Sequence, residues 1–347
     1  MAERDAVLKW LLEPDNPPVR YLTLTNLLGK PAGDREVQSA KAKLGNYEVT
    51  QAILARTDDF LDDDDDRAYW KYTGKYWQLI FLGQCLAGED PRIARLAERI
   101  LARSKWVSKA GGQCLTANIL AALTRLGYGA HPVVEEQREA LARRINAEGG
   151  IECQVMDYSL LPRCYMAQPK LLLCLAEAPP EKRSPAIRAA IQLLVDSLLE
   201  NEVFVYVPGN RKAWQRILER QPKAASLPKG QTVKEWIARE RQSFLAKHGF
   251  GEREAKAGWL KFGFPLHYNS DALEAMYALA RLGVPYSPRM EKALLAIESK
   301  QTPGGRWILE NSLNGKMLVD VETKGKPSKW LTCFARCVLQ HFHRTAA

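Results

Sequence analysis

His267 and Asp271 are the two residues whose types and spacing best suit acid-base chemistry in this sequence. They lie four positions apart, just before an apolar helical pattern that begins near residue 272. On a turn that enters a helix, this spacing can bring the imidazole next to the carboxylate, which would then orient the His as a general acid or base. In the competing interpretation, Asp271 or Ser270 caps the helix by accepting hydrogen bonds from its first backbone N–H groups. The sequence leaves both interpretations open.

Further candidates lie in the loops that precede other apolar helical patterns. If the helices close into a ring, the inner helices all run the same way, and the loops before them meet at one mouth of a central cavity. Two more carboxylates in these loops are catalytic candidates, Asp157 and Glu310. The candidates for contact with substrate are Tyr72, Tyr76, Trp77, Cys114, Cys153, Tyr158, Tyr268 and Trp307. Aromatic walls with a few acid-base groups suit a hydrophobic small molecule.

The cysteines argue for a reduced protein. There are seven, which is an odd number, and their spacing is irregular, so we expect a cytoplasmic protein and not a disulfide framework. No Cys-x-x-Cys pair occurs, which disfavours a zinc ribbon or knuckle. Cys114, Cys153 and Cys164 would join His267 and Asp271 around a zinc ion only if the ring brings them together, and small buried cysteines are more common. We predict no cofactor and keep zinc as the less favoured alternative.

A run of five aspartates, Asp62 to Asp66, admits three interpretations. It could hold one buried, protonated acid whose pKa is raised by its like-charged neighbours. It could offer oxygen ligands to a cation. Five contiguous acids cannot all be buried, so the favoured interpretation is a solvated loop.

The element pattern predicts an all-α protein. Apolar helical runs alternate with amphipathic ones, and no convincing strand alternation appears. Helix pairs are predicted at 19–29 with 34–44, 76–82 with 91–101, 116–127 with 132–145, 168–175 with 185–199, and 270–283 with 288–299. The apolar run 330–340 has no partner after it, and the helix predicted at 2–12 would supply one. We therefore predict a single domain over residues 1–347, with about six inner and outer helix pairs. Closure into an α/α toroid is preferred to an open repeat array.

Three segments carry a resemblance to a known family: Gly111 to Leu123, Trp259 to Asp271, and Gly305 to Glu310. With the repeat pattern, they resemble the prenyltransferase and squalene-oxidase repeat group, which includes the terpenoid cyclases. The resemblance implies an α/α toroid and a cyclase-like lyase or isomerase that acts on an isoprenoid-like or polycyclic molecule. The string Asp62 to Asp65 fits the Asp-x-Asp-Asp acid motif of some cyclases formally. The zinc-binding context of protein prenyltransferases, and the regular Gln and Trp repeat of the cyclases, are not matched.

The positive charge is concentrated in one segment. The formal net charge is +10, and residues 203–261 contribute thirteen Lys or Arg against five Glu. This segment also interrupts the regular spacing of the helix pairs. This basic insertion could be a lid over the cavity, an oligomer contact, a solvated loop or a site that binds nucleic acid or a membrane surface. No run of 18 apolar residues occurs, so we expect no transmembrane segment.

We expect an enzyme with a hydrophobic small-molecule substrate and no nucleic-acid partner, and we leave a homo-oligomer open. The alternative is a non-catalytic helical-repeat scaffold that binds a partner through the basic insertion.

Overall fold

The protein is described by a computed structural model of residues 2–345, except 62–66, 104–111, 152–159 and 161–163. Within this part of the chain, helices dominate and the strands are only two or three residues long. The all-α prediction is therefore confirmed. No helix among the described residues is both long enough and apolar enough to cross a membrane.

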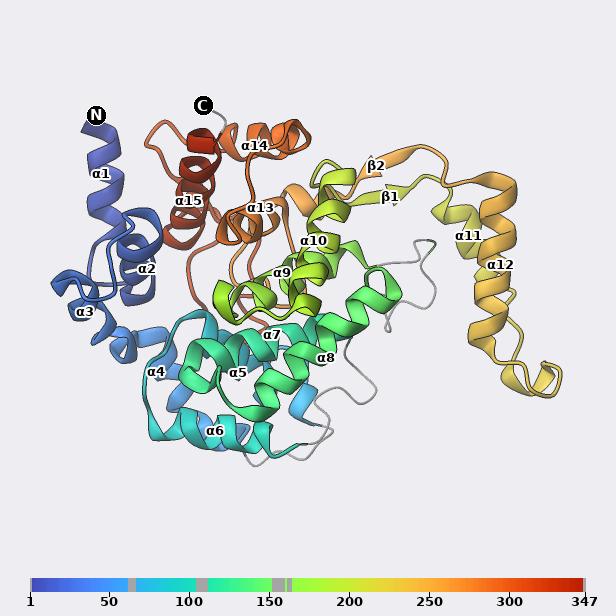
Figure 1. The fold of residues 1–347 in the computed structure, drawn as a ribbon, viewed down its shortest axis with the longest axis horizontal. Coiled ribbons are helices and arrows are strands. Elements are labelled where there is room, and N and C mark those ends of the chain that lie inside the picture. Colours follow the sequence, from blue (N-terminus) through green and yellow to red (C-terminus); the bar gives the residue numbers. More distant parts are fainter. Residues whose placement is uncertain (1, 62–66, 104–111, 152–159, 161–163, 346–347) are drawn as a thin grey trace.

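Six helical segments pack side by side in succession (Figure 1). They are α2 (Pro17–Leu22) with its π-helical continuation η1 (Thr23–Leu27), α5 (Lys75–Gln84), α7 (Gln113–Leu123) with η5 (Thr124–Tyr128), α9 (Gln168–Ala176), α13 (Ala272–Arg281) and α15 (Lys329–Thr345). α5 contacts α7, α7 contacts α9, α9 contacts α13, α13 contacts α15, and α15 contacts α2 and η1. Nearly every residue of α5 and α7 is buried, as expected for helices that are apolar on all sides. These six segments form the inner set.

Each inner helix packs against an amphipathic partner. The outer partners are α3 (Arg35–Lys41) on α2, α6 (Pro91–Leu101) on α5, α8 (Pro132–Glu148) on α7, α10 (Pro185–Glu200) on α9, α14 (Glu291–Glu298) on α13 and α1 (Ala2–Leu11) on α15. Three outer helices start with Pro directly after a side-chain cap; at α10, Ser184 Oγ accepts from the Ile187 N–H at 3.1 Å. The predicted helix pairs are confirmed, including the pair formed from opposite ends of the chain.

The inner helices approach closely where side chains are small. A Cβ atom on Gly83 of α5 would lie 2.5 Å from the Cα atom of Ala122 on α7, so only glycine fits at this crossing. The two backbones therefore pack directly against each other, which fixes the spacing of α5 and α7 in the inner set.

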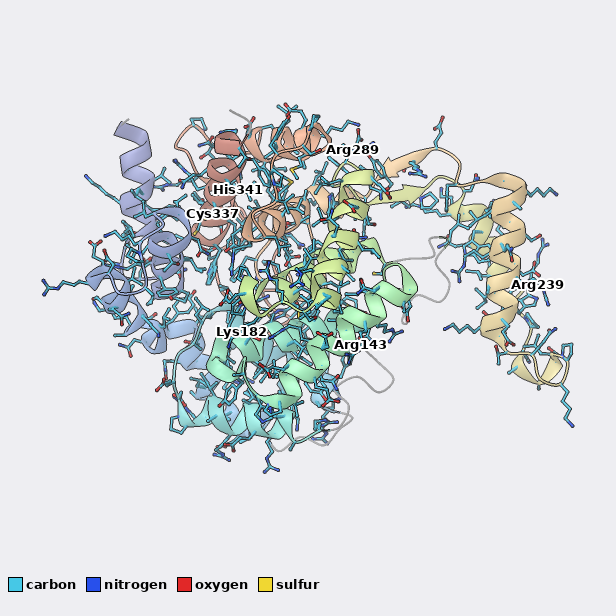
Figure 2. All side chains as sticks on the ribbon, viewed as in Figure 1. Arg143, Lys182, Arg239, Arg289, Cys337 and His341 are labelled. Carbon is cyan, nitrogen blue, oxygen red and sulfur yellow. The ribbon has the colours of Figure 1, made fainter. Side chains whose placement is uncertain are left out.

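The basic insertion forms an arm, which we define as residues 206–255. The arm starts and ends in a two-stranded antiparallel ribbon, β1 (Tyr206–Pro208) and β2 (Arg253–Ala255), in which Tyr206 pairs with Ala255. Beyond the ribbon, α11 (Arg211–Leu218) and α12 (Val233–His248) stand away from the body (Figure 1), and Arg239 of α12 lies far out on the arm (Figure 2). The sequence pattern predicts helices at about 210–220 and 232–247 in this segment, and both are confirmed.

The arm has a small apolar cluster, to which one residue from outside the arm also contributes. Trp214, Ile237 and Phe244 are buried together with Leu160, and the rings of Trp214 and Phe244 lie 5.7 Å apart. The two tryptophans of the arm therefore serve packing: Trp214 is buried, and Trp236 packs partly buried against this cluster.

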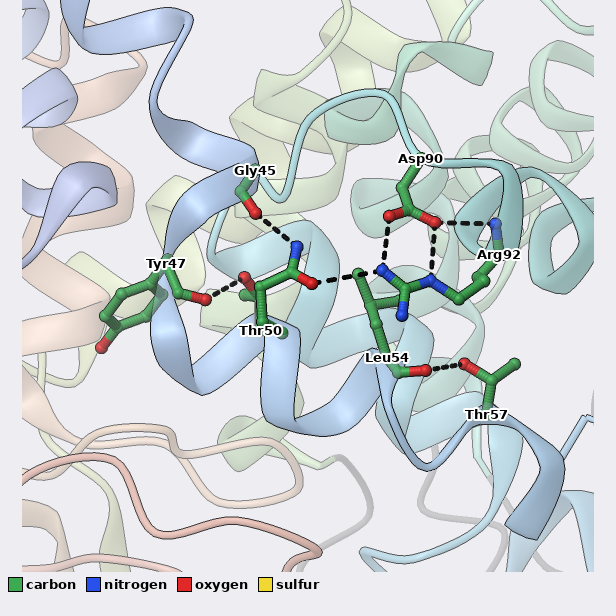
Figure 3. Close-up of polar contacts among 8 residues, drawn as sticks. Gly45, Tyr47, Thr50, Leu54, Thr57, Asp90 and Arg92 are labelled. Carbon is green, nitrogen blue, oxygen red and sulfur yellow. Dashed lines mark hydrogen bonds and ion pairs between the residues drawn. The ribbon is translucent and has the colours of Figure 1, made fainter.

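A polar network joins the N-terminal helices to the α5–α6 pair (Figure 3). Arg92, at the start of α6, forms an ion pair with Asp90 at 2.8 Å and donates to Gln51 Oε1 at 3.2 Å. Gln51 lies in α4 (Glu48–Leu54) and donates in turn to the backbone oxygen of Gly45. The segment 44–57 therefore bridges the two ends of the succession of inner helices, between α2 and α5.

The loop before α15 differs from the sequence prediction. The dipeptide Asn314-Gly315 is typical of a hairpin turn, and the sequence therefore predicts a short hairpin over residues 311–322. The strands are instead β3 (Trp307–Ile308) and β4 (Pro327–Ser328), on either side of that stretch. Within it, the Asn314 side chain donates to the backbone oxygen of Glu322 at 2.6 Å, which holds the loop together without a ladder.

Candidate functional site

A pocket of about 270 Å³ lies among the inner helices. Every one of the six inner segments contributes to its lining, either directly or through the residues that follow it. Much of the wall is apolar: Leu22, Leu173, Phe264, Leu273, Leu331 and Phe334. Two carboxyl groups at the start of α13 face the same space, those of Asp271 and Glu274. The arm contributes no residue to this lining, so it does not cover the pocket as a lid.

Asp271 is the N-cap of α13 and is 1% exposed. Its Oδ1 accepts from the Glu274 N–H at 2.8 Å, and its Oδ2 accepts from the Gly263 N–H at 2.9 Å. Burial, with a further contribution from the Glu274 carboxylate, raises the pKa of Asp271 to about 7, against the opposing effect of these hydrogen bonds and of Lys170. A carboxyl group with this pKa exchanges a proton readily near neutral pH.

Glu274 follows one turn later and is paired with Lys170 of α9. The Lys170 side chain is 1% exposed and that of Glu274 is 14% exposed, so this ion pair is buried between two inner helices. Glu274 Oε2 is buried and has no hydrogen-bond partner in the described structure. A second acceptor oxygen therefore lies in the pocket wall next to Asp271.

A second charged group lies where the pocket meets α9 and η5. Arg125 Nε donates to Glu177 Oε1 at 2.8 Å. Burial opposes ionisation of Glu177, but Arg125 and Arg281 outweigh it, so the pKa of Glu177 is lowered. Asn26 donates to the Tyr277 hydroxyl at 3.0 Å nearby. This polar end of the pocket can orient a ligand whose body lies against the apolar wall.

The expected pairing of His267 with Asp271 is wrong. His267 is fully buried, and neither ring nitrogen has a hydrogen-bond partner in the described structure. Its ring lies among those of Tyr72, Trp77 and Phe81, at centroid distances of 6.2, 5.6 and 6.1 Å. Burial, with a smaller contribution from Lys170, lowers its pKa to about 3, so the imidazole is neutral at pH 7.

The backbone explains why the pair does not form. His267 has φ of +44°, a left-handed conformation that is uncommon for residues other than glycine. Its backbone oxygen accepts from the Asn118 side chain of α7 at 2.9 Å. Asp271 meanwhile uses both of its oxygens on backbone N–H groups, so the capping interpretation holds for Asp271.

The loop before α5 and the loop before α13 meet, and their aromatic side chains fill the space between them. Trp77 lies 5.4 Å from Tyr72 and 6.1 Å from Tyr268 between ring centroids, and Tyr76 is 2% exposed. None of these four aromatic residues lines the pocket among the inner helices. The prediction that they form substrate-contacting walls is therefore not supported by their placement. Tyr72 and Tyr268 pack on Trp77, and Tyr72 and Trp77 pack on His267.

Trp307 and Glu310 anchor the loop before α15. Trp307 is 1% exposed; its indole N–H donates to the Ile297 oxygen at 2.8 Å, and its backbone N–H donates to Thr332 Oγ1 at 3.0 Å. Glu310 accepts from the Phe262 N–H at 3.0 Å and pairs with Lys300 at 2.6 Å. Neither residue lines the pocket among the inner helices. These contacts assign both residues to positioning the loop.

The remaining predicted residues are Cys114 and several that lie outside the described part of the chain. Cys114 lies at the start of α7 and is partly buried. Cys153, Asp157, Tyr158 and the run Asp62 to Asp66 lie outside the described residues. Among those that the structure describes, no three His, Cys, Asp or Glu side chains are grouped so as to hold a metal ion.

Lys170, Glu274 and the group around Arg125 and Glu177 were not among the site residues predicted from sequence. A signal for them exists, because each of these charges sits in or just after a helix that is otherwise apolar. A buried charge is costly unless it is paired or used, so an isolated charge in an apolar helix marks a functional candidate. Three comparisons, with protein-family models, with curated proteins and with solved structures, each found no match to this chain.

Proposed function

We propose that the inner helices form a closed α/α toroid and that the pocket among them is an active site. Its substrate is a hydrophobic small molecule, isoprenoid-like or polycyclic, and its chemistry is acid-base chemistry of the isomerase, lyase or cyclase type. The contacts from α5 through to α15, the contact of α15 with α2, and the bridge at 44–57 support closure. The family resemblance of the repeat pattern points to the same architecture.

The observation that carries the proposal is the position of Asp271. Its carboxyl group is buried in a pocket with an apolar wall, and its pKa is raised to about 7. Such a group is protonated for part of the time at neutral pH and is a stronger acid than water, which suits a proton donor. Each Asp271 oxygen accepts one backbone hydrogen bond, which leaves the second lone pair of either oxygen for the proton.

In the isomerase form of this chemistry, Asp271 and Glu274 act on the two ends of a double bond. The Asp271 proton forms a new C–H bond at one end. The carbon next to the other end loses a proton to Glu274 Oε2, so the double bond moves by one position. The substrate gains one proton and loses one, and no electrons are exchanged. Transfer of the proton from Glu274 to Asp271 restores the starting state. Lys170 holds Glu274 in place through its other oxygen.

The experiment is a comparison of what co-purifies with wild type and with variants of the pocket. Organic extracts of the purified protein are analysed by mass spectrometry, and any apolar molecule found is then tested as substrate. Leu173→Trp places a larger side chain in the pocket wall and is expected to remove the molecule. Leu193→Trp, at a partly buried position of the outer helix α10, is the matched control and is expected to retain it.

Turnover then separates chemistry from binding. Asp271→Asn is expected to keep the ligand and to lose turnover by about 100-fold or more, the usual contribution of a general acid. A variant that keeps full activity would contradict the role given to Asp271. A pocket that retains no apolar molecule and binds none added from solution would contradict the substrate class.

The alternative, a scaffold that binds a partner through the basic insertion, is favoured by one observation. The arm stands away from the body with a small apolar cluster and contributes nothing to the pocket. It follows that whatever the arm binds is bound independently of the pocket.

A further inference from the structure

We propose that the arm, residues 206–255, binds the phosphate backbone of a double-stranded nucleic acid and reads no base sequence. This binding site is separate from the pocket and does not depend on the pocket's proposed chemistry. It revises the expectation from sequence that nucleic acid is not a partner.

The charge of the protein is concentrated at the far end of the arm. Residues 210–250, which comprise α11, α12 and their connection, hold ten Lys or Arg and three Glu, a net charge of +7 out of +10. The rest of the chain is therefore almost balanced. A local surplus of this size creates a strongly positive surface that attracts a polyanion.

These positive charges are not neutralised by the arm's own acids. Arg239 forms an ion pair with its neighbour Glu240 at 3.7 Å. Glu235 is occupied in the capping box that starts α12, where it accepts from the Thr232 N–H at 2.8 Å. Exposed basic side chains of the arm for which the described structure shows no ion pair include Lys212, Arg216, Lys223 and Lys234. Charges left open in this way are free to pair with phosphate.

The apolar residues of the arm decide which polyanion fits. Helices that bind membranes present an apolar face to the lipid, but the apolar faces of α11 and α12 are packed together around Trp214, Ile237 and Phe244. Single-strand binding uses exposed aromatic rings on which bases stack, and the large exposed hydrophobic residues of the described chain, Leu28, Trp70 and Leu295, all lie outside the arm. A surface with charge and without exposed apolar side chains suits the backbone of a duplex.

The geometry is compatible with this partner. The ribbon of β1 and β2 holds the two helices away from the body, so a rod-shaped partner can reach α12 without meeting the inner helices (Figure 1). α12 has 16 residues, a length of about 24 Å, which corresponds to about seven base-pair rises along a duplex. Lys212 and Arg216 lie four residues apart and share one face of α11.

The test measures binding of the full chain to a labelled DNA duplex of about three helical turns and mixed sequence, by fluorescence anisotropy over a range of salt concentrations. The arm variant replaces four exposed charges together, Lys212→Gln, Arg216→Gln, Lys223→Gln and Lys234→Gln. We expect its affinity at low salt to fall by about ten-fold or more. The slope of log affinity against log salt concentration should become less negative by up to about 3 to 4.

A matched control removes the same charge from the body. Arg35→Gln, Lys41→Gln, Lys43→Gln and Lys324→Gln are also exposed and have no ion pair in the described structure. This control is expected to bind the duplex within about two-fold of wild type, and circular dichroism checks that both variants are folded. Equal losses in the two variants would overturn the proposal, because binding would then follow net charge alone.

Two further probes discriminate between partners. The proposal requires the duplex to bind more tightly than a single strand of the same length, and more tightly than vesicles made from equal parts of phosphatidylcholine and phosphatidylserine. Tighter binding of the single strand or of the vesicles would overturn it, as would the absence of binding to the duplex at low salt. Neither result would affect the assignment of the pocket.

Discussion

Lys170 of α9 and Glu274 of α13 form a buried ion pair that joins two neighbouring inner helices beside Asp271. The same pair thus holds α9 against α13 and sets part of the electrostatic environment of the pocket. It leaves one Glu274 oxygen free and places a positive charge close enough to lower the pKa of Asp271, against the larger effect of burial.

Removal of one partner of this ion pair should destabilise the protein strongly. Lys170→Met leaves the Glu274 carboxylate buried without its counter-charge, and we expect a loss of about 3–5 kcal/mol in the free energy of unfolding. Urea denaturation followed by circular dichroism measures it. The double variant Lys170→Met with Glu274→Leu should recover most of the loss. The exposed pair of Lys292 with Glu202 is the control, and Lys292→Met should change the free energy of unfolding much less, because solvent screens an exposed pair. Similar losses for the two lysines would contradict a buried pair.

His267 should destabilise the protein as the pH falls. Its pKa is about 3 in the folded protein and 6.5 for the free side chain, so between these values the unfolded chain takes up a proton that the folded protein does not. Stability is therefore lost as the pH drops below about 6.5. His267→Phe has no imidazole to take up a proton in the unfolded chain. Its free energy of unfolding should therefore rise relative to that of wild type by about 2–3 kcal/mol as the pH falls from 7 to 4.5. An identical dependence in both proteins would show that His267 is not buried and neutral.

Asp271 should have the opposite dependence on pH. Its pKa is raised to about 7 from 3.8, so between these values the folded protein holds a proton that the unfolded chain has lost. The free energy of unfolding of wild type therefore declines by about 2–4 kcal/mol from this group as the pH rises from about 4 to 7. Asp271→Asn does not titrate, so this decline should be absent from the variant. Asp271→Asn keeps one acceptor oxygen, so it can retain only one of the two contacts to the Gly263 and Glu274 N–H groups. Asp271→Ala loses both and should be less stable than the Asn variant by about 1–2 kcal/mol. Denaturation across this pH range distinguishes the two roles of the carboxyl group, and equal slopes in wild type and Asp271→Asn would contradict the raised pKa.

Gly263 should not tolerate a side chain. A Cβ atom there would lie 2.6 Å from the backbone oxygen of Asn311, where the two segments form a parallel bridge. Gly263→Ala must therefore shift the backbone that donates to Asp271, at a cost of about 1–3 kcal/mol. Gly258→Ala is the control, since nothing lies within 4 Å of its added Cβ. Thermal unfolding compares the two variants. If Gly263→Ala is as stable as wild type, the backbone at residue 263 does not approach Asn311 this closely.

The helices could be predicted because they are local patterns. The apolar run that became α7 and the Pro-led amphipathic run that became α8 were both identified from period and caps alone. The same holds for α11 and α12, whose turn residues and charges separate them from the repeat. The arm's shape was not predictable, because it depends on three residues of β1 pairing with a strand more than forty residues away.

The candidate site was predicted only in part. Asp271 was identified and does line the pocket, but its assigned partner, His267, faces Tyr72 and Trp77 instead. Spacing along the chain cannot show which way a side chain turns when the backbone adopts a positive φ, as it does at His267. Lys170 and Glu274 are 104 positions apart and meet only because α9 packs on α13.

The sequence by itself determined the helical character, the pairing of inner with outer helices and the location of the positive charge. These follow from residue types within one or two turns, where the periodicity of the helix decides which side chains share a face. Only the tertiary structure decided that the aromatic loops fill a core, that the pocket is lined by Asp271 and Glu274, and that the basic segment stands apart as an arm. The physical reason is that burial and ion pairing depend on contacts between residues far apart in the chain. These contacts set the pKa of Asp271 and leave the charges of the arm exposed.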